Sequence, residues 1–197
     1  MKTKNELRRQ WIASEFASFR DAMMRSLPGE TGIAVRRRFY GWHETVRVLH
    51  GVEIQHAGNL RLGRNVVIAA GCKLCAAAAI TIEDDVLIGP DCSIWTQDHV
   101  TASLTVPILE QGYERDPVTI GKGCWIGCRS VILKGVTLPE GVVVAAGSVV
   151  TKSSAERAAP YYVLAGVPAR PTGSRVHGEQ GPDVNLGDLG NGNKNLS

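Results

Sequence analysis

The sequence has few aromatic residues, and it has neither a long uncharged apolar run nor an apolar leader. Phe, Trp and Tyr together make up 6% of the 197 residues. A core with so few large rings must be filled by Val, Ile, Leu and Ala, which favours thin, regular layers. No apolar run reaches the roughly 20 residues of a membrane span. The start, MKTKNELRRQ, lacks the apolar segment of a secretory signal. We therefore expect a cytoplasmic protein with no integral membrane segment.

The net charge and the cysteine count exclude further classes. The formal charge is +3, which is too small to indicate a nucleic-acid partner, and we predict none. The five cysteines are odd in number, which argues against a framework of disulfides. Hydrophobic residues at 44% and charged residues at 21% are ordinary for a globular protein, and they exclude disorder over the whole length.

A six-residue repeat of branched aliphatic residues runs through most of the chain. A period of six does not match the 3.6 residues of a helical turn, but it fits a short strand followed by a turn. Three such units close one triangular coil of a parallel β-helix, with the aliphatic residues stacked inside. The sequence therefore predicts an all-β solenoid. The repeat positions are Val48, Ile54, Leu60; Leu62, Ile68, Leu74, Ile80; Ile82, Ile88, Ile94; and Ile120, Ile126, Ile132, Leu138, Val144, Val150.

A second position of the repeat, four residues after the aliphatic one, is usually small or β-branched. We expect these side chains at the tight corners of the coils. Cys72 and Cys75 form a C-x-x-C pair, a spacing also found in metal and redox sites. Because Cys72 falls on a corner position, we interpret the pair as small buried residues and predict no metal. The corner positions are Cys72, Ala78, Cys92, Cys124, Ser130, Val136, Val142 and Ser148.

The segment from 97 to 118 breaks the repeat with polar residues and two prolines. An insertion in a solenoid forms an extended loop on one face, which is often the binding face. Beyond the repeat, residues 172–197 are rich in Gly and Asn and have no aromatic residue. We predict that they form a disordered tail.

The first 47 residues form a different unit from the repeat. Apolar residues recur at helical spacing over residues 4–27, and Pro28-Gly29 follows as a stop, so we predict an α-helical arm. This arm is either a cap over the open end of the coils or a helix that contacts a partner or, weakly, a membrane surface. The basic triplet at 36–38 is a solvated turn or a contact to anionic lipid or phosphate.

The repeat region resembles a known family over about residues 48–171. The stretch VTIGKGCWIGCRSVILKGVTLPEGVVVAAGSVVTKS, followed by YYVLAGVPAR, is similar to the C-terminal half of the hexapeptide-repeat acyltransferases. These include galactoside and maltose O-acetyltransferases and the acetyltransferases of polysaccharide assembly. The resemblance implies a left-handed parallel β-helix, an exception to the usual right-handed crossover. It also implies acetyl-CoA as co-substrate and a homotrimer whose active sites are shared between neighbours.

The family chemistry requires a general base. Acetyl transfer to a hydroxyl needs a group that accepts the hydroxyl proton and donors that stabilise the oxyanion, and an imidazole titrates near neutral pH. Of the five histidines, only His99 lies where the longest loop leaves the coils, which is where similar proteins have their catalytic histidine. We therefore assign His99 as the base. Asp98 either orients it or is a solvated loop acid.

The resemblance also implies a donor site on the last coils. Lys152 and Arg170 match the coenzyme A contacts of the family, since Arg offers a planar fork and Lys a point charge to phosphate; exposed corner charges are the alternative. Trp125 lines the pantetheine channel or packs at a subunit interface. Gly127 or a neighbour supplies an amide to the oxyanion. By position, the backbone contacts to the pantetheine arm are Cys128, Ala146 and Thr151.

The function predicted from the sequence is an acetyl-CoA-dependent O-acetyltransferase. Its acceptor is a hydroxyl of a sugar or other small molecule, in the assembly of surface polysaccharide or lipopolysaccharide. Two alternatives stay open: an N-acetyltransferase of an amino sugar or antibiotic, and a non-catalytic β-helix scaffold. A zinc hydrolyase on the same fold needs three imidazoles around one metal, and the sequence has no H-x4-H pair. The early stretch CKLCAAAAI lacks the Asn that several relatives use for their acceptor, so the acceptor is not identified.

Overall fold

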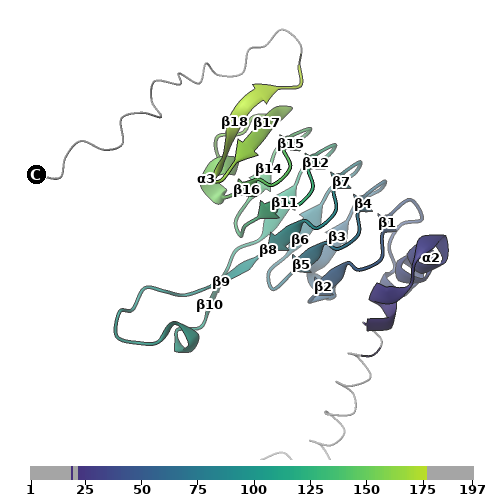
Figure 1. The fold of residues 1–197 in the computed structure, drawn as a ribbon, viewed down its shortest axis with the longest axis horizontal. Helices are drawn as coiled ribbons and strands as arrows, with labels where there is room; N and C mark the ends of the chain where they lie inside the picture. The colour runs from purple at the N-terminus through teal and green to yellow at the C-terminus, as the bar shows by residue number, and fades with distance from the viewer. Residues whose placement is uncertain (1–18, 20–21, 177–197) are drawn as a thin grey trace, which may run out of the picture.

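The computed structural model describes residue 19 and residues 22–176 of the chain. Most of the helix expected over residues 4–27 lies outside the described residues, as does the expected tail beyond Val176. What is described is a column of coils with a short helical arm at one end and a projecting hairpin near its middle (Figure 1).

Three sheets form the sides of this column, and their strands are parallel apart from β18. The strands follow the three sheets in turn, so each circuit of the chain adds one coil. The first sheet contains β1 (Arg47–Val48), β4 (Val67–Ile68), β7 (Leu87–Ile88), β12 (Trp125–Ile126), β15 (Val143–Val144), β17 (Tyr162–Gly166) and β18 (Ala169–Ser174). The second contains β2 (Glu53–Gln55), β5 (Lys73–Cys75), β8 (Ser93–Trp95), β13 (Val131–Ile132) and β16 (Val149–Val150). The third contains β3 (Leu60–Leu62), β6 (Ile80–Ile82), β11 (Val118–Ile120) and β14 (Thr137–Leu138). This confirms the parallel β-helix, in an arrangement consistent with the left-handed form.

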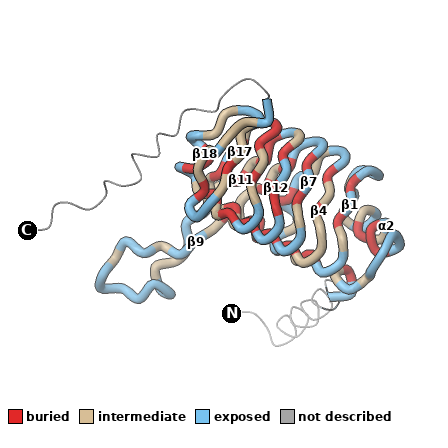
Figure 2. The backbone as a smooth tube through the Cα atoms, turned by 45° about the horizontal axis from the view of Figure 1, so that its top comes forward, coloured by how far each residue is buried: buried red, intermediate tan, exposed pale blue. Residues whose placement is uncertain are grey.

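The aliphatic residues of the repeat line the inside of the column. Ile88, Ile126 and Val144 lie in register on successive coils of the first sheet, and each is 0% exposed. Figure 2 shows buried positions recurring along the coils. Each layer covers the next, so the burial of branched side chains is the main stabilising term. Ile80 and Ile82 are both buried in β6, which explains the two-residue slip in the repeat: this side of the coil carries two inward residues.

Seven of the eight corner residues are buried, as the repeat predicts, and the eighth, Ala78, is partly buried. Cys72, Cys92 and Ser130 are stacked on the corner between the first and second sheets, and all three are 0% exposed. The Cys92 thiol donates to the carbonyl of Gly127 on the next coil at 3.1 Å, so its buried donor is satisfied. Cys75 is also buried, so both members of the C-x-x-C pair are small buried residues. In the described part of the chain, no group of three His, Cys, Asp or Glu residues is arranged to hold a metal ion.

The structure confirms one expectation for the arm and corrects another. The helical residues 22–26 end before Pro28-Gly29, as the stop predicts, and a separate helix, α2 (Gly29–Tyr40), begins there. The basic triplet at 36–38 lies on this helix and not in a solvated turn. The sequence is misleading at this point because a run of like charges gives no sign of which side chain a helix turns inward.

Arg36 is the inward member of the triplet and is 3% exposed. Its Nε donates to the carbonyl of Val48 at 2.8 Å, and its Nη1 donates to the carbonyls of Met24 at 2.7 Å and Leu27 at 3.0 Å. These donors satisfy carbonyls that the end of the coil and the turn before α2 leave without partners. Arg36 therefore fastens the arm to the first coil, and its remaining Nη2 is buried without a hydrogen-bond partner in the described chain.

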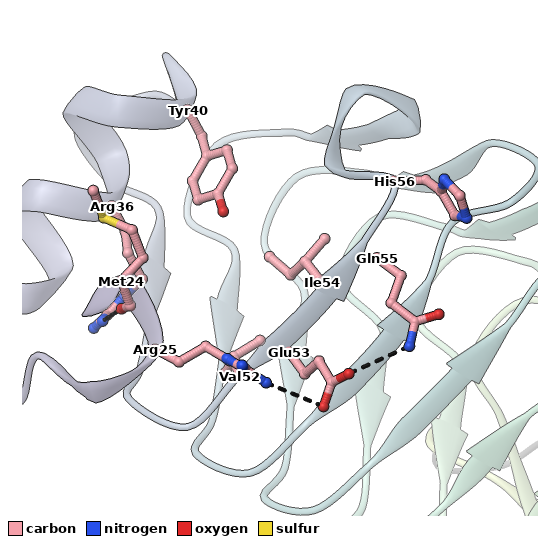
Figure 3. Close-up of a pocket in the computed structure, with 9 residues that line it drawn as sticks. All are labelled: Met24, Arg25, Arg36, Tyr40, Val52, Glu53, Ile54, Gln55 and His56. Carbon is pink, nitrogen blue, oxygen red and sulfur yellow. Dashed lines mark hydrogen bonds and ion pairs between the residues drawn. The ribbon is translucent and has the colours of Figure 1, made fainter. Parts of the chain in front are cut away.

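The arm covers the first coil incompletely. A cavity of about 280 Å³ lies between α2 and β2, with Tyr40 on one side and Ile54 on the other (Figure 3). Ile54 occupies an inward position of the repeat and is nevertheless only partly buried. At the mouth, Glu53 lies 3.4 Å from Arg25 and accepts a hydrogen bond from Gln55 at 3.3 Å. The described part of the arm thus packs as a partial cap.

The interrupting segment forms a hairpin that leaves the column between β8 and β11. Its base is the antiparallel pair β9 (Gln97–His99) and β10 (Tyr113–Arg115), and it carries a short 3-10 helix, η2 (Ile108–Glu110). Thr96 fixes the base: its buried hydroxyl donates to the carbonyl of Cys75 at 2.7 Å, and its carbonyl accepts from Asp116 at 3.0 Å. Figure 1 shows the hairpin extending well beyond the coils.

The described C-terminal end is the hairpin of β17 and β18, which ends at Ser174, three residues beyond the expected boundary at 171. Before it, α3 (Lys152–Ala155) is capped by the Thr151 hydroxyl, which accepts from the amide of Ser154. A second 3-10 helix, η1 (Ala57–Asn59), precedes β3. Across the described ranges, no helix combines the length and apolarity that crossing a membrane requires.

Candidate active site

His99 is the last residue of β9, at the base of the hairpin, and is exposed. It pairs in register with Tyr113 on β10, and the two rings lie 4.4 Å apart with a tilt of 38°. This contact limits the orientations open to the imidazole. Among the described residues, no side chain or backbone group hydrogen-bonds to the ring. Its nitrogens are thus accessible, as a base that meets an external hydroxyl requires. The sequence offered no reason to single out Tyr113, because the pairing depends on the register of the hairpin.

Asp98 is not brought to the His99 ring by this hairpin. Successive residues of a strand point to opposite faces, so the two side chains leave β9 on opposite sides. Asp98 pairs in register with Glu114, a residue of the same charge. Glu114 in turn lies 3.4 Å from Lys134 on the neighbouring coil. Within one chain, Asp98 is therefore a strand acid on the far face from the imidazole.

The corner between the first and second sheets holds a second group of expected site residues. Only glycine fits at position 127, since a Cβ there would lie 2.5 Å from the amide nitrogen of Ala146. Its own N–H already donates to Val144 at 2.7 Å, so it is not free for an oxyanion. Cys128 and Ala146 are exposed residues, and their N–H groups make no hydrogen bond within the described chain. These two amides, and not that of Gly127, are left without a partner there.

Trp125 lies beside this corner on β12 and is 51% exposed. It pairs in register with Leu87 and Val143 on the coils on either side. Leu87 is 44% exposed, so the outer face of the first sheet presents an apolar stripe. An exposed stripe of this kind is typical of a ligand channel or of an interface, which are the two roles expected for Trp125.

The corner between the second and third sheets carries Thr151 and Lys152. The Thr151 hydroxyl is engaged in capping α3. Lys152 Nζ lies 3.2 Å from Asp116 Oδ2, and both side chains are partly exposed. Asp116 ends the limb of the hairpin that begins with β10. This ion pair therefore connects the last coils to the base of the hairpin, where His99 lies. An exposed pair contributes little to stability, so Lys152 can exchange Asp116 for another anion.

Arg170 lies on β18 and pairs in register with Ala165. Its Nη1 is buried and has no hydrogen-bond partner in the described chain. A buried guanidinium nitrogen without an acceptor is costly, and a phosphate oxygen is the acceptor that suits its geometry. The geometry thus supports an anion contact for Arg170.

The expected site residues fall into two groups on different corners of the triangle. The hairpin with His99, together with Thr151 and Lys152, occupies the corner between the second and third sheets. Cys128 and its neighbours occupy the corner between the first and second sheets. The second sheet lies between the two groups within one chain.

Comparison with known proteins identifies the repeat. Residues 117–152 match the family model described as the hexapeptide repeat of succinyl-transferase. Galactoside O-acetyltransferase of Escherichia coli is 34% identical over 125 residues, which cover 60% of this chain and 56% of that protein. These matches confirm the resemblance to hexapeptide-repeat acyltransferases. The chain spans about half the length of the curated relatives it matches, with 37%, 56% and 52% of the first three covered.

Two solved structures share the fold at higher coverage. A hexapeptide-repeat acetyltransferase of Vibrio cholerae, in complex with acetyl coenzyme A, has a TM-score of 0.64 at 27% identity. The match covers 79% of this chain and 83% of that one. A galactoside acetyltransferase in complex with coenzyme A has a TM-score of 0.63 at 27% identity, with 79% of each chain covered.

Proposed function

We propose that this chain, a hexapeptide-repeat β-helix related in sequence to acetyltransferases, is an O-acetyltransferase that transfers the acetyl group of acetyl-CoA to a sugar hydroxyl. The observation that carries the proposal is the exposed imidazole of His99, held by Tyr113 where the hairpin leaves the coils. The acetyltransferase relatives, including the galactoside enzyme, support the reaction and the sugar class. A role in surface polysaccharide assembly and a cytoplasmic location belong to the same proposal and rest on the sequence alone.

His99 acts as general base in this reaction. Its neutral imidazole accepts the proton of the acceptor hydroxyl as the oxygen attacks the thioester carbonyl carbon. The carbonyl oxygen becomes an oxyanion, and the N–H of Cys128, which has no partner within the described chain, stabilises it. When the tetrahedral intermediate collapses, the carbon–sulfur bond breaks and the imidazolium returns the proton to the departing thiolate. The products are the acetyl ester and coenzyme A.

The donor lies along the last coils. Arg170, with its unpaired buried Nη1, and Lys152, with its exchangeable ion pair, bind the phosphates. The amide of Ala146 holds the pantetheine arm, which passes over Cys128, and Trp125 lines its channel. These contacts use different residues from the base, so donor binding and proton transfer are separable by substitution.

The protein acts as a homotrimer in this proposal, because the two groups of site residues lie on different corners of one chain. His99 of one copy meets the Cys128 corner of the next. A contact between two different corners is heterologous, and it closes into a ring when the rotation is threefold. Two exposed apolar surfaces support the arrangement: the stripe with Leu87 and Trp125, and the tip of the hairpin, where Leu104 is 99% exposed and Leu109 82%.

The test is the release of free thiol from acetyl-CoA with a panel of acceptors. Neutral sugars, amino sugars and aminocyclitol antibiotics are compared at equal concentration, with mass analysis of the product. Faster release with a neutral sugar and formation of an acetyl ester support the proposal. An amide product from an amino sugar supports the N-acetyltransferase instead. No acceptor-dependent release, with acetyl-CoA still bound, supports the non-catalytic scaffold.

A further inference from the structure

A groove lies on the outer face of the second sheet, next to the strand that leads into the hairpin. Gln55, Cys75 and Trp95 are in register on three successive coils, as are Glu53 and Lys73. Together these residues border a cavity of about 190 Å³. The sequence did not single out any of them as a binding residue, because the groove exists only when the first three coils are stacked.

The groove combines an aromatic wall with a polar rim. Trp95 is partly buried, and its register neighbour Cys75 is 2% exposed, so the floor is apolar. Gln55 donates to Glu53 at 3.3 Å and keeps its carbonyl oxygen open. Lys73 is exposed and forms no ion pair with any described residue. A flat aromatic face bordered by an amide, a carboxylate and an ammonium suits a ring that is apolar on one face and carries hydroxyl groups at its edge.

The groove lies beside the corner that carries the proposed general base. Trp95 ends β8, and His99 follows four residues later, a distance that an extended chain spans in at most ~13 Å. Thr96 pins the chain between them through its bonds to Cys75 and Ala78. The groove belongs to the first three coils, whereas the donor residues belong to the last ones, so both substrates can be bound at once.

From this juxtaposition we infer that the groove is the subsite for the sugar ring of the acceptor, with Trp95 as its stacking platform. Gln55, Lys73 and Glu53 bind the ring hydroxyls and thereby select which of them reaches His99. The inference rests on the proposed function and names its substrate class as a hexopyranoside. It also explains how a chain without the family's early-coil Asn can hold a sugar: the aromatic face on β8 replaces that contact.

The experiment measures sugar binding without acetyl-CoA, so that it does not depend on turnover. Methyl glycosides of the common hexoses, together with maltose, are titrated against the full chain by saturation-transfer NMR and calorimetry. Trp95→Ala should raise the dissociation constant of the bound glycoside about tenfold or more, since loss of a stacking face costs on the order of one decade. Trp95→Phe, which keeps a flat face, should stay within about threefold. Thr137→Ala, on the outer face of the third sheet, is the matched control and should bind like the parent.

Each outcome decides the inference. Equal affinity of the parent and Trp95→Ala, or no binding of any glycoside by the parent, overturns it. If Trp95→Ala does not fold by circular dichroism, Gln55→Ala replaces it, because Gln55 is exposed. Undiminished glycoside binding by Gln55→Ala then overturns the inference. Failure of the sugar-subsite assignment is distinguishable from failure of the proposed acetyl transfer. Thiol release with a non-sugar acceptor shows acetyl transfer even when no glycoside binds.

Discussion

The base of the hairpin fixes the position of His99, but it supplies no protein partner for the imidazole nitrogens among the described residues. We predict that His99→Ala lowers kcat by about 10²–10⁴, the usual effect of removing a general base. The affinity for acetyl-CoA should stay unchanged, because the donor contacts come from other residues. Steady-state kinetics at saturating donor, with direct binding of acetyl-CoA, measure the two effects. Retention of more than about a third of the turnover would refute the assignment.

The ring of Tyr113 provides a graded control for that experiment. Tyr113→Phe keeps the ring contact at the base of the hairpin and should keep most of the activity. Tyr113→Ala removes the contact and should lower kcat less than His99→Ala does, because the base is still present but is less well oriented.

Arg170 has a clear energetic reason to bind an anion. Its buried Nη1 lacks an acceptor in the described chain, so a phosphate oxygen there satisfies a group that is otherwise unpaired. Arg170→Ala should raise the Michaelis constant for acetyl-CoA by about tenfold with little change in kcat, because it removes binding that is equal in the ground and transition states. Arg175→Ala is the matched control, because the side chain of Arg175 already donates to the carbonyl of Gly141 at 2.9 Å. An unchanged donor constant in Arg170→Ala would contradict the donor placement.

Cys128 is distinguished from the other four cysteines by its exposure. All five lie in the described part of the chain, and the other four are buried. We predict that a disulfide reagent modifies one thiol rapidly in the folded protein, and that Cys128→Ser removes this fast phase. Because the pantetheine arm is proposed to cover Cys128, acetyl-CoA at ten times its dissociation constant should slow the reaction about tenfold. Modification at an unchanged rate in saturating acetyl-CoA would contradict this donor position.

At the scale of elements, the buried Cys124 at the corner between the third and first sheets makes the coils less stable in alkali. Burial raises the pKa of the Cys124 thiol to about 11 from a reference value of 9.0. The unfolded chain ionises this thiol near pH 9, whereas the folded chain keeps it neutral. The stabilisation is therefore fully present below pH 9 and is lost as the pH rises toward 11.

Replacement of this thiol by Val tests that linkage. Val46, Val66, Val86 and Val142 occupy the equivalent corner on other coils and are all buried, so Cys124→Val should fold normally. Between pH 8 and pH 10.5 the parent should lose about 1–2 kcal/mol more in its free energy of unfolding than Cys124→Val does. Urea unfolding at both pH values measures the difference. Parallel losses in the two proteins would show that the thiol does not titrate with unfolding.

The elements also show how far the sequence alone could lead. The inward positions were predictable, because a stacked coil gives every sixth residue the same environment. Aliphatic side chains such as Ile88 and Val144 are buried at these positions. The burial of Arg36 could not be predicted from the sequence, since it depends on the angle at which α2 meets the first coil. The same holds for Tyr113 and Trp95: the sequence contains the residues, but hairpin register and coil stacking decide what lies beside them.

At the scale of the whole molecule, the outer faces of the sheets differ in character. The first sheet presents Val67, Leu87, Trp125 and Val143 in register, whereas the equivalent row of the third sheet carries Arg61 followed by threonines. The apolar face is the one that association would cover, and it adjoins the corner with Cys128. Association through it therefore also sets where the two halves of the site meet.

We predict that the protein sediments at three times its chain mass of 21.2 kDa and that Leu87→Glu dissociates it. A carboxylate at the centre of an apolar interface loses its hydration without gaining a partner, which costs several kcal/mol. Thr137→Glu, the matched change on the polar third sheet, should leave the assembly intact. Analytical ultracentrifugation measures both. A parent protein that is monomeric and active would contradict the shared site.

Assemblies that contain chains of two different variants then test whether one active site is formed by residues of two chains. His99→Ala chains lack the base but keep Arg170, and Arg170→Ala chains lack the phosphate contact but keep His99. Each alone should be poorly active at limiting acetyl-CoA. When the two are unfolded and refolded together, some interfaces join an intact His99 to an intact Arg170 from a different chain, so thiol release should rise above the average of the separate proteins. If base and phosphate contact belonged to one chain, every site in the mixture would keep one defect, and no gain would be seen.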